Sequence, residues 1–190
     1  MIRKVLLAVA ALVAGAALAE PVTYTVDPSH TYPAFEADHM GGMSIWRGKI
    51  KSTTGSFTLD KAAKTGEVSV TMDMASIDFG HDKMSEHARS ADMFNVAKFP
   101  TATYKGKVSK WNGDAPAEVD GELTLHGVTK PVKLTLNSFM CKANPMTRKE
   151  TCGADAVANI DRGDFGVAYG KDFGFKMGVK LLISIEAVRS

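Results

Sequence analysis

The sequence predicts an all-β domain built from short antiparallel strands. Two observations support this expectation. Apolar and polar residues alternate with a period of two in one segment after another, and turn residues such as glycine, proline, asparagine and aspartate separate these segments. Such alternation gives each strand one face in the core and one in water. Short turns between strands fit antiparallel neighbours better than βαβ units.

The first residues carry the pattern of an export signal. Two basic residues precede an apolar run over residues 5–18, and Ala17 and Ala19 form the small-x-small pattern that signal peptidase recognises. The run is too short for a membrane span, which needs about 20 apolar residues. We therefore predict a cleaved signal peptide over residues 1–19, periplasmic localisation, and one mature domain over residues 20–190.

Charge excludes one class of partner. The full chain has 23 Lys and Arg against 21 Asp and Glu, and two of the basic residues, Arg3 and Lys4, belong to the export signal. The mature domain is therefore neutral in side-chain charge. Because it also lacks a basic stripe, we expect no nucleic-acid partner.

The expected strands of the first half precede a helical insertion. Residues 23–26 are β-branched and aromatic, 35–39 alternate, 56–59 place two apolar residues on one face, and 67–74 alternate most clearly. The Met/Gly-rich stretch 40–43, followed by Trp46 and Arg47, has the composition of a mobile loop. Residues 81–94 break the alternation with helix-forming residues, so we expect one or two helical turns there, with an apolar face of Met84, Ala88 and Ala91.

Five further strands are expected in the second half. They cover residues 101–108, 118–125, 132–136, 154–160 and 177–188, with clear turn residues between several of them. About eight strands with one apolar face each can form either a sandwich or a barrel, and a barrel interior can be filled or can hold a ligand. Small residues on the apolar faces, such as Gly121, and many methionines favour a cavity, although both also suit an ordinary core.

The two cysteines, Cys141 and Cys152, are predicted to form a disulfide. An exported chain meets an oxidising compartment, where an even number of cysteines usually pairs. Closing so short a loop stabilises by about 3 kcal/mol on the chain-entropy model. The alternative is a metal or redox pair, but the spacing is not C-x-x-C and no histidine lies beside it. The five histidines show no metal-ligand spacing either, so we expect no metal site.

No catalytic residue is predicted, and we expect the protein not to be an enzyme. The sequence contains no G-x-S-x-G motif, and the adjacent Ser29 and His30 say nothing about a triad. A disulfide would also leave neither cysteine free as a nucleophile.

Four groups of residues carry a resemblance to a known family. They are Tyr24-x-Val26-Asp27-x-x-His30; Arg89-Ser90-Ala91-Asp92-x-Phe94-Asn95 with Phe99-Pro100-x-Ala102; Gly121-x-Leu123-Thr124-Leu125-His126-Gly127-Val128-Thr129-Lys130-Pro131-Val132; and Asp164-Phe165-Gly166. The mature sequence resembles the YceI family of periplasmic, lipocalin-like polyisoprenoid-binding proteins over essentially its whole length.

The resemblance implies a fold and a ligand. The fold is an eight-stranded antiparallel lipocalin-like barrel with an elongated cavity. The ligand is a long isoprenoid lipid, either a quinone such as ubiquinone or a polyprenyl phosphate, with no cofactor besides it. Two alternatives stay open: a ligand-free barrel filled by side chains, and an enzyme that acts on a lipid-like substrate. Transient membrane contact is compatible with either reading, as are a monomer and a homodimer.

Apolar faces and turn positions supply the candidate site. The residues expected to line the cavity are Phe35, Ala37, Phe57, Val70, Met72, Met74, Leu123, Leu125, Leu134, Leu136, Leu181 and Ile183. About half of them should touch ligand, the others serving as core. Three polar residues are candidates for binding the lipid headgroup at the cavity mouth: Arg47, Arg162 and Tyr169. The alternative for each of the two arginines is that it is a solvated turn residue.

Overall fold

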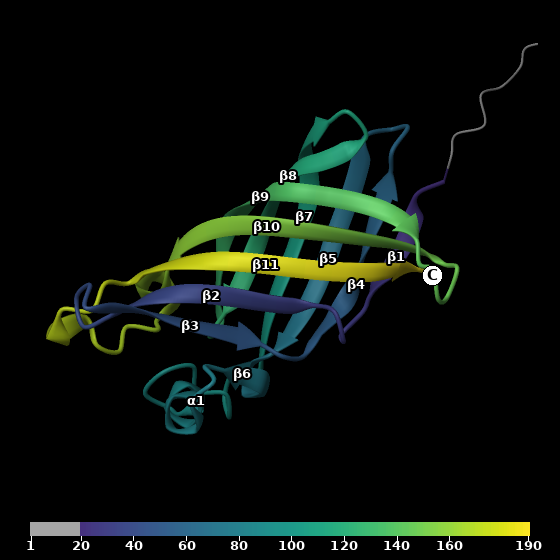
Figure 1. Cartoon of the computed structure of the whole chain (residues 1–190). Coiled ribbons are helices and arrows are strands. Elements are labelled where there is room, and N and C mark those ends of the chain that lie inside the picture. Colours follow the sequence, from purple (N-terminus) through teal and green to yellow (C-terminus); the bar gives the residue numbers. More distant parts are fainter. Residues whose placement is uncertain (1–19) are drawn as a thin grey trace, which may run out of the picture.

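The computed structural model describes residues 20–190, and the predicted signal peptide over residues 1–19 lies outside the described residues. The strands are β1 (Val22–Val26), β2 (Tyr32–His39), β3 (Ser44–Ile50), β4 (Thr53–Asp60), β5 (Thr65–Asp73), β6 (Ile77–Asp78), β7 (Thr101–Asn112), β8 (Ala115–Leu125), β9 (Val128–Ala143), β10 (Glu150–Asp161) and β11 (Gly178–Arg189) (Figure 1). The helices are α1 (Asp82–Arg89) and the 3-10 turns η1 (Met74–Ser76), η2 (Arg162–Phe165) and η3 (Lys171–Phe173).

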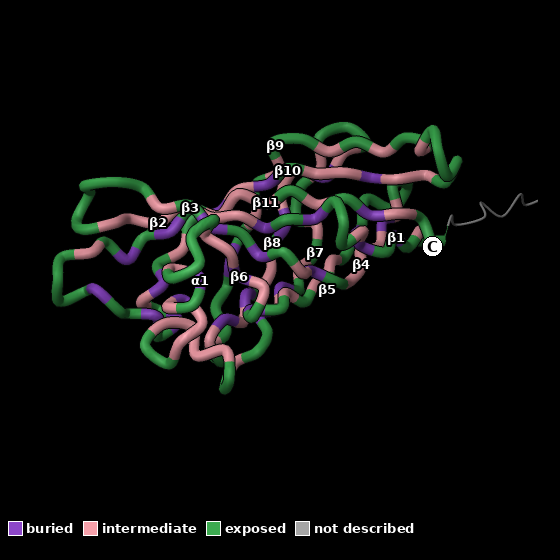
Figure 2. The backbone as a smooth tube through the Cα atoms, turned by 60° about the horizontal axis from the view of Figure 1, so that its bottom comes forward, coloured by how far each residue is buried: buried purple, intermediate pink, exposed green. Residues whose placement is uncertain are grey.

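Eight of the strands within residues 20–190 form a closed antiparallel barrel. Their order is β1-β4-β5-β7-β8-β9-β10-β11, and pairing of β1 with β11 closes the ring. This confirms the predicted eight-stranded barrel. Buried positions alternate with less buried ones along these strands (Figure 2), as the period of two requires.

One end of the barrel is lengthened by a hairpin of β2 and β3. β11 pairs with β1 near its C-terminal end, where Tyr24 faces Arg189, and with β2 near its start, where Ala37 faces Val179. β1 and β2 therefore pair with successive parts of the same strand, β11, and a bend separates them. The short strand β6 continues this extension by pairing with β3.

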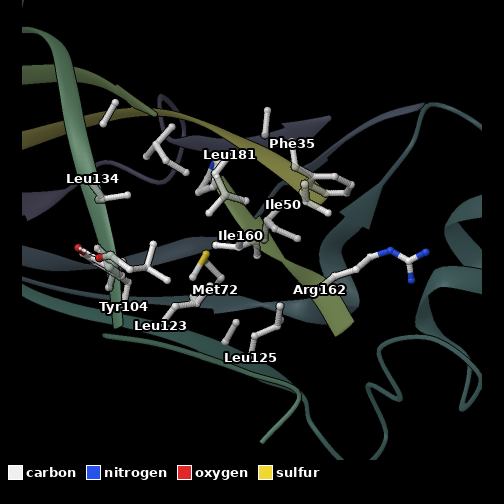
Figure 3. A pocket seen from close by; sticks show the side chains of 18 of the residues that line it. Phe35, Ile50, Met72, Tyr104, Leu123, Leu125, Leu134, Ile160, Arg162 and Leu181 are labelled. Carbon is white, nitrogen blue, oxygen red and sulfur yellow. Dashed lines mark hydrogen bonds between the residues drawn. The ribbon is translucent and has the colours of Figure 1, made fainter. Parts of the chain in front are cut away.

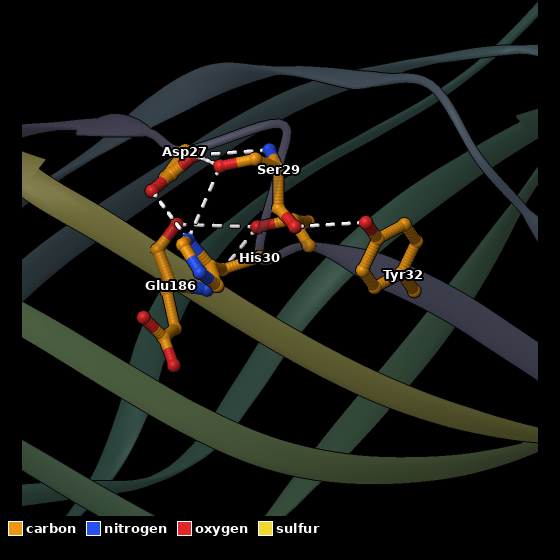
Figure 4. A network of polar contacts seen from close by, with 6 residues as sticks. Asp27, Ser29, His30, Tyr32 and Glu186 are labelled. Carbon is orange, nitrogen blue, oxygen red and sulfur yellow. Dashed lines mark hydrogen bonds and ion pairs between the residues drawn. The ribbon is translucent and has the colours of Figure 1, made fainter.

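The bend between β1 and β2 is held by the polar motif near the start of the mature chain. Asp27 accepts hydrogen bonds from the backbone N–H of Ser29 at 2.9 Å and faces Nδ1 of His30 at 2.8 Å (Figure 4). The hydroxyl of Thr31, which is fully buried, donates to the carbonyl oxygen of Glu186 on β11. Ser29 and His30 thus contribute to a turn in which both side chains contact the same carboxylate.

Residues 40–43 form the turn between β2 and β3, but the expectation that the loop extends through Arg47 is wrong, because Ser44–Ile50 forms β3. Its register pairs Trp46 with Ala37 and Arg47 with Glu36. The alternation is hard to see because an inward position is a glycine: a Cβ on Gly48 would lie 2.5 Å from Cζ of Phe35. Because Gly48 has no side chain, the ring of Phe35 occupies the space on the inward face of β3. The sequence therefore lacks an apolar residue at a position where the inward face is in fact covered.

The helical insertion is present as α1, shorter than the predicted segment 81–94. The side chain of His81 caps its N-terminus by accepting from the backbone N–H of Met84. Ala88 is fully buried, but Ala91 follows the end of the helix and is exposed, so the predicted apolar face is only partly right. None of the helices within residues 20–190 is long and apolar enough to cross a bilayer.

The predicted disulfide is confirmed at the end of the barrel that lies away from the β2–β3 turn. Cys141 and Cys152 face each other on β9 and β10 with an S–S distance of 2.03 Å. Cys152 packs with Tyr24, Leu59 and Ala187 in a small core cluster. The larger cluster runs along the rest of the barrel interior and extends under α1.

Candidate functional site

An apolar cavity of about 480 Å³ occupies the barrel interior (Figure 3). Its walls come from nearly all the strands and from α1, and they consist almost wholly of aliphatic, thioether and aromatic side chains. Pockets that bind small organic molecules have volumes of roughly 300–1,000 Å³ and mostly apolar walls. The barrel is therefore not packed solid by its own side chains.

All twelve residues expected to line a cavity do line this one. They are Phe35, Ala37, Phe57, Val70, Met72, Met74, Leu123, Leu125, Leu134, Leu136, Leu181 and Ile183. All but Met74, which lies in η1 directly after β5, come from strands, and their alternation in the sequence allowed the apolar face to be assigned to the interior. That about half of them contact a ligand stays a prediction.

Sequence reasoning missed the part of the wall nearest the mouth. These residues come from β3 and from the segment between β6 and β7: Trp46, Ile50, Phe79, Met84, His87, Met93 and Phe94. Met84 could have been assigned from the apolar face of the predicted helix. Trp46 could not, because β3 itself was not recognised.

A buried tyrosine lies among the apolar residues of the wall. The hydroxyl of Tyr104, a residue only 5% exposed, donates to the carbonyl oxygens of Val132 at 2.9 Å and Val119 at 3.3 Å. Burial raises the pKa of Tyr104 far above its ordinary value, with a smaller contribution from Asp120. The phenol stays neutral, and its polar group is satisfied by backbone rather than by ligand.

Gly121 accommodates this tyrosine. A Cβ on Gly121 would lie 2.6 Å from the Oη atom of Tyr104 and 2.5 Å from the carbonyl oxygen of Lys105. The small residue that suggested extra cavity space is therefore covered by the neighbouring ring. Its role is to let Tyr104 lie flat against β8.

The mouth of the cavity is lined by aromatic and histidine side chains. His39 packs against Trp46 at 5.0 Å between ring centroids and against Phe175 at 5.4 Å. Across the opening, His87 of α1 meets the ring of Tyr169 edge to face at 4.7 Å. All five residues line the cavity. The β2–β3 hairpin, α1 and the segment before β11 thus share one opening.

Arg162, a predicted headgroup residue, is buried rather than solvated. Its guanidinium donates to the carbonyl oxygens of Val167 at 2.7 Å and Tyr169 at 2.8 Å, which fixes the segment after η2. Desolvation lowers its pKa, while Asp161 and Asp38 act in the opposite direction. In Figure 3 the guanidinium extends away from the apolar side chains, toward one end of the cavity. These two bonds use two of its five N–H donors.

The other two headgroup candidates are placed differently. Arg47 pairs with Glu36 at 2.8 Å, with a side chain 69% exposed, and does not belong to the cavity wall. The reason is strand alternation: Trp46 points inward on β3, so Arg47 points outward. Its assignment to the mouth is therefore wrong. Tyr169 lies at the mouth and remains a candidate.

Potential metal ligands converge at one place within residues 20–190. Cys141, Glu150 and Cys152 bring their ligand atoms within 4.8 Å of one another. Because the two sulfur atoms are bonded to each other, neither is available as a thiolate ligand.

Comparison with known proteins identifies relatives along the whole mature chain. The UPF0312 protein of Ectopseudomonas mendocina is 35% identical over 190 residues, covering 96% of this chain and 97% of that protein. Protein YceI of Escherichia coli O6:H1 is 34% identical over 178 residues, covering 93% and 91%.

Two solved structures share the fold. BcnA of Burkholderia cenocepacia superimposes with a TM-score of 0.68 at 24% identity, covering 85% of this chain and 99% of that one. A polyisoprenoid binding domain from Saccharophagus degradans superimposes with a TM-score of 0.63 at 14% identity, covering 89% and 99%. The sequence itself matches the YceI-like domain over residues 24–187. The chain therefore belongs to the family of proteins with a YceI-like domain.

Proposed function

We propose that this protein binds a long isoprenoid chain in its barrel and carries it through the periplasm. The observation that supports this most directly is the cavity of about 480 Å³ with almost wholly apolar walls. A solved structure with the same fold is a polyisoprenoid binding domain, which supports the same class of ligand.

The cavity volume sets the length of chain that it can enclose. If a methylene group takes about the volume of a liquid water molecule, about 30 Å³, the cavity holds about 16 carbon atoms, or about three isoprene units. Burial of that many carbons contributes on the order of 10 kcal/mol at about 0.8 kcal/mol each. Micromolar binding requires about 8 kcal/mol. The tail alone therefore supports binding, and a longer chain extends through the mouth.

The headgroup is expected at the mouth, where specificity should be loose. Arg162 has N–H donors beyond the two that hold the loop, and Tyr169, whose carbonyl oxygen accepts one of those two bonds, is an exposed residue that also lines the cavity. Either group suits a quinone oxygen or a phosphate. We infer a quinone such as ubiquinone or a polyprenyl phosphate as the ligand, held without covalent chemistry and without turnover.

The periplasmic part of the proposal is supported by two features. Residues 1–19 have the pattern of a signal peptide. The disulfide between Cys141 and Cys152 suits an oxidising compartment.

Mass spectrometry tests the proposal. The full chain is expressed with its own signal, and the protein is purified from the periplasm without detergent and extracted with organic solvent. We expect a near-stoichiometric isoprenoid, and its headgroup identifies the ligand class. A protein that carries no lipid, and that takes up neither ubiquinone nor polyprenyl phosphate when these are added, contradicts the proposal and favours a ligand-free barrel.

A further inference from the structure

Exposed apolar side chains gather around the mouth of the cavity. Eight large hydrophobic residues are exposed within residues 20–190, and five of them lie close to the turn between β2 and β3 or on the segment before β11. We call these five the mouth rim: Met40, Met43, Ile45, Tyr169 and Phe173. The outermost two, Met43 and Phe173, are 74% and 76% exposed.

The two segments of the mouth rim form one surface. The backbone N–H of Lys176 donates to the carboxylate of Asp38 at 3.0 Å, and the ring of Phe175 packs on His39. A Cβ on Gly41 would lie 3.1 Å from the carbonyl oxygen of Gly174, so the two turns are in close contact. Both project from the end of the barrel opposite the C-terminus (Figure 1). The exposed apolar groups are therefore held together.

Turn chemistry does not account for these residues. Met40 has a φ of 52°, a left-handed conformation that favours glycine, asparagine or aspartate over methionine. Phe173 occupies a 3-10 turn between Gly170 and Gly174, both with positive φ. A polar residue could adopt the backbone conformation of either turn, and its exposure to water would be less unfavourable in free energy. Exposed apolar side chains that gather on two touching segments in this way are typical of an interaction site.

The mouth rim continues directly into the cavity wall. Tyr169 belongs to both, and His39 and Phe175, which join the two segments, also line the cavity. An isoprenoid chain entering or leaving the barrel thus passes over apolar side chains. Such a lipid resides in a bilayer before it is bound. The surface around the cavity mouth must therefore come close to a bilayer when the protein takes up the lipid.

We propose that the mouth rim inserts into the surface of a lipid bilayer and places the cavity mouth against the lipid. This rests on the proposed function. Charge determines the mode of attachment: Lys171 and Lys176 in the segment before β11 are balanced by Asp172 and Asp38. Binding is therefore apolar insertion, independent of anionic lipid and little affected by salt.

Flotation with vesicles tests the docking separately from ligand binding. The probe is phosphatidylcholine vesicles without isoprenoid, mixed with delipidated mature protein. Replacing both Met43 and Phe173 with serine should lower vesicle binding at least about tenfold, because two large side chains no longer enter the bilayer. The matched control replaces Met140 and Met146, which are 65% and 91% exposed near the opposite end, and should bind as the parent does.

A second measurement separates docking from the cavity. Both double variants are titrated in solution with a ubiquinone of three isoprene units, and both should bind it as the parent does, which also shows that they are folded. Retained ubiquinone binding with no flotation of the parent protein overturns the docking proposal alone. A parent that floats but takes up neither isoprenoid class overturns the carrier function instead.

A second copy of the chain is the competing occupant of the mouth rim. Sedimentation velocity distinguishes it. A parent dimer that the Met43/Phe173 variant dissociates, together with the absence of vesicle binding, would assign this surface to self-association. We expect the parent and both variants to sediment alike.

Discussion

The hydroxyl of Tyr104 donates a hydrogen bond to the carbonyl oxygen of Val132, 2.9 Å away, from within the wall of an apolar cavity. The bond ties β7 to β9 across the intervening β8, since these three strands are consecutive in the barrel. A polar group in this place stabilises the wall without offering a donor to the ligand. The cavity can therefore stay apolar although a phenol takes part in lining it.

Replacing Tyr104 with phenylalanine should destabilise the fold by about 0.5–1.5 kcal/mol, the typical net value of a hydrogen bond. Isoprenoid affinity should be unchanged, because the hydroxyl is bonded to backbone carbonyl oxygens and the proposed tail would meet only the ring. Urea unfolding of the delipidated protein measures the first effect and ligand titration the second. The matched control is Tyr32→Phe, which removes an exposed hydrogen bond to Ser29 and should cost less. A large loss of affinity in Tyr104→Phe would assign the hydroxyl to the ligand.

Gly121→Ala should cost about 1–3 kcal/mol or more, because the added methyl overlaps the Tyr104 ring and a backbone carbonyl of β7. The comparison is Gly178→Ala on β11, where a Cβ would meet nothing within 4 Å. That change should be neutral or slightly stabilising. Thermal unfolding of both variants measures the difference. Equal midpoints would contradict the account of Gly121.

The sequence was informative where alternation is unbroken. Val70, Met72 and Leu123 could be placed on an inward face because each strand shows it directly. It was uninformative where a side chain is absent for a packing reason. Gly48 interrupts β3 to admit Phe35, and this concealed the strand that directs Trp46 inward and Arg47 outward.

Long-range contacts account for the other differences. Arg162 lies in a polar run that is typical of a solvated turn, yet the chain folds back to supply the carbonyl oxygens of Val167 and Tyr169. The closure of β1 on β11 joins the two ends of the mature chain, and residue patterns within single strands contain no information about it. The closed barrel was predicted from the resemblance to a family and not from the alternation of apolar and polar residues.

The contact between His30 and Asp27 predicts a pH dependence of stability. Hydrogen bonding and charge attraction from Asp27 raise the pKa of His30, so this contribution is complete below the unfolded value of about 6.5 and is lost as pH rises through the folded value. Hydrogen bonds from Ser29 and His30 lower the pKa of Asp27 to about 2, so its contribution is lost only as pH falls toward that value. As pH is raised from 5 to 9, the thermal unfolding midpoint of the parent should fall more than that of the His30→Gln variant. If the thermal midpoints of the parent and the variant change with pH in the same way, His30 does not contribute to the pH dependence of stability.

Filling the cavity from one strand should weaken ligand binding without loss of the fold. Ala156 on β10 is 5% exposed and lines the cavity, so Ala156→Phe places a ring in the space that the tail is proposed to occupy. The neighbouring Val157 does not line the cavity, and Val157→Phe on the same strand is the matched control. Overfilling a packed core costs about 1–3 kcal/mol, whereas a ring that enters an existing cavity should cost less.

Lipid extraction and ubiquinone titration of the two phenylalanine variants give the readout. We expect at least about a tenfold loss of affinity in Ala156→Phe, since a ring displaces several carbons of the tail at about 0.8 kcal/mol each. Val157→Phe should carry and bind lipid as the parent does. If Ala156→Phe also binds normally while remaining folded, the isoprenoid lies outside the barrel, and the cavity is a consequence of the fold that the ligand does not use.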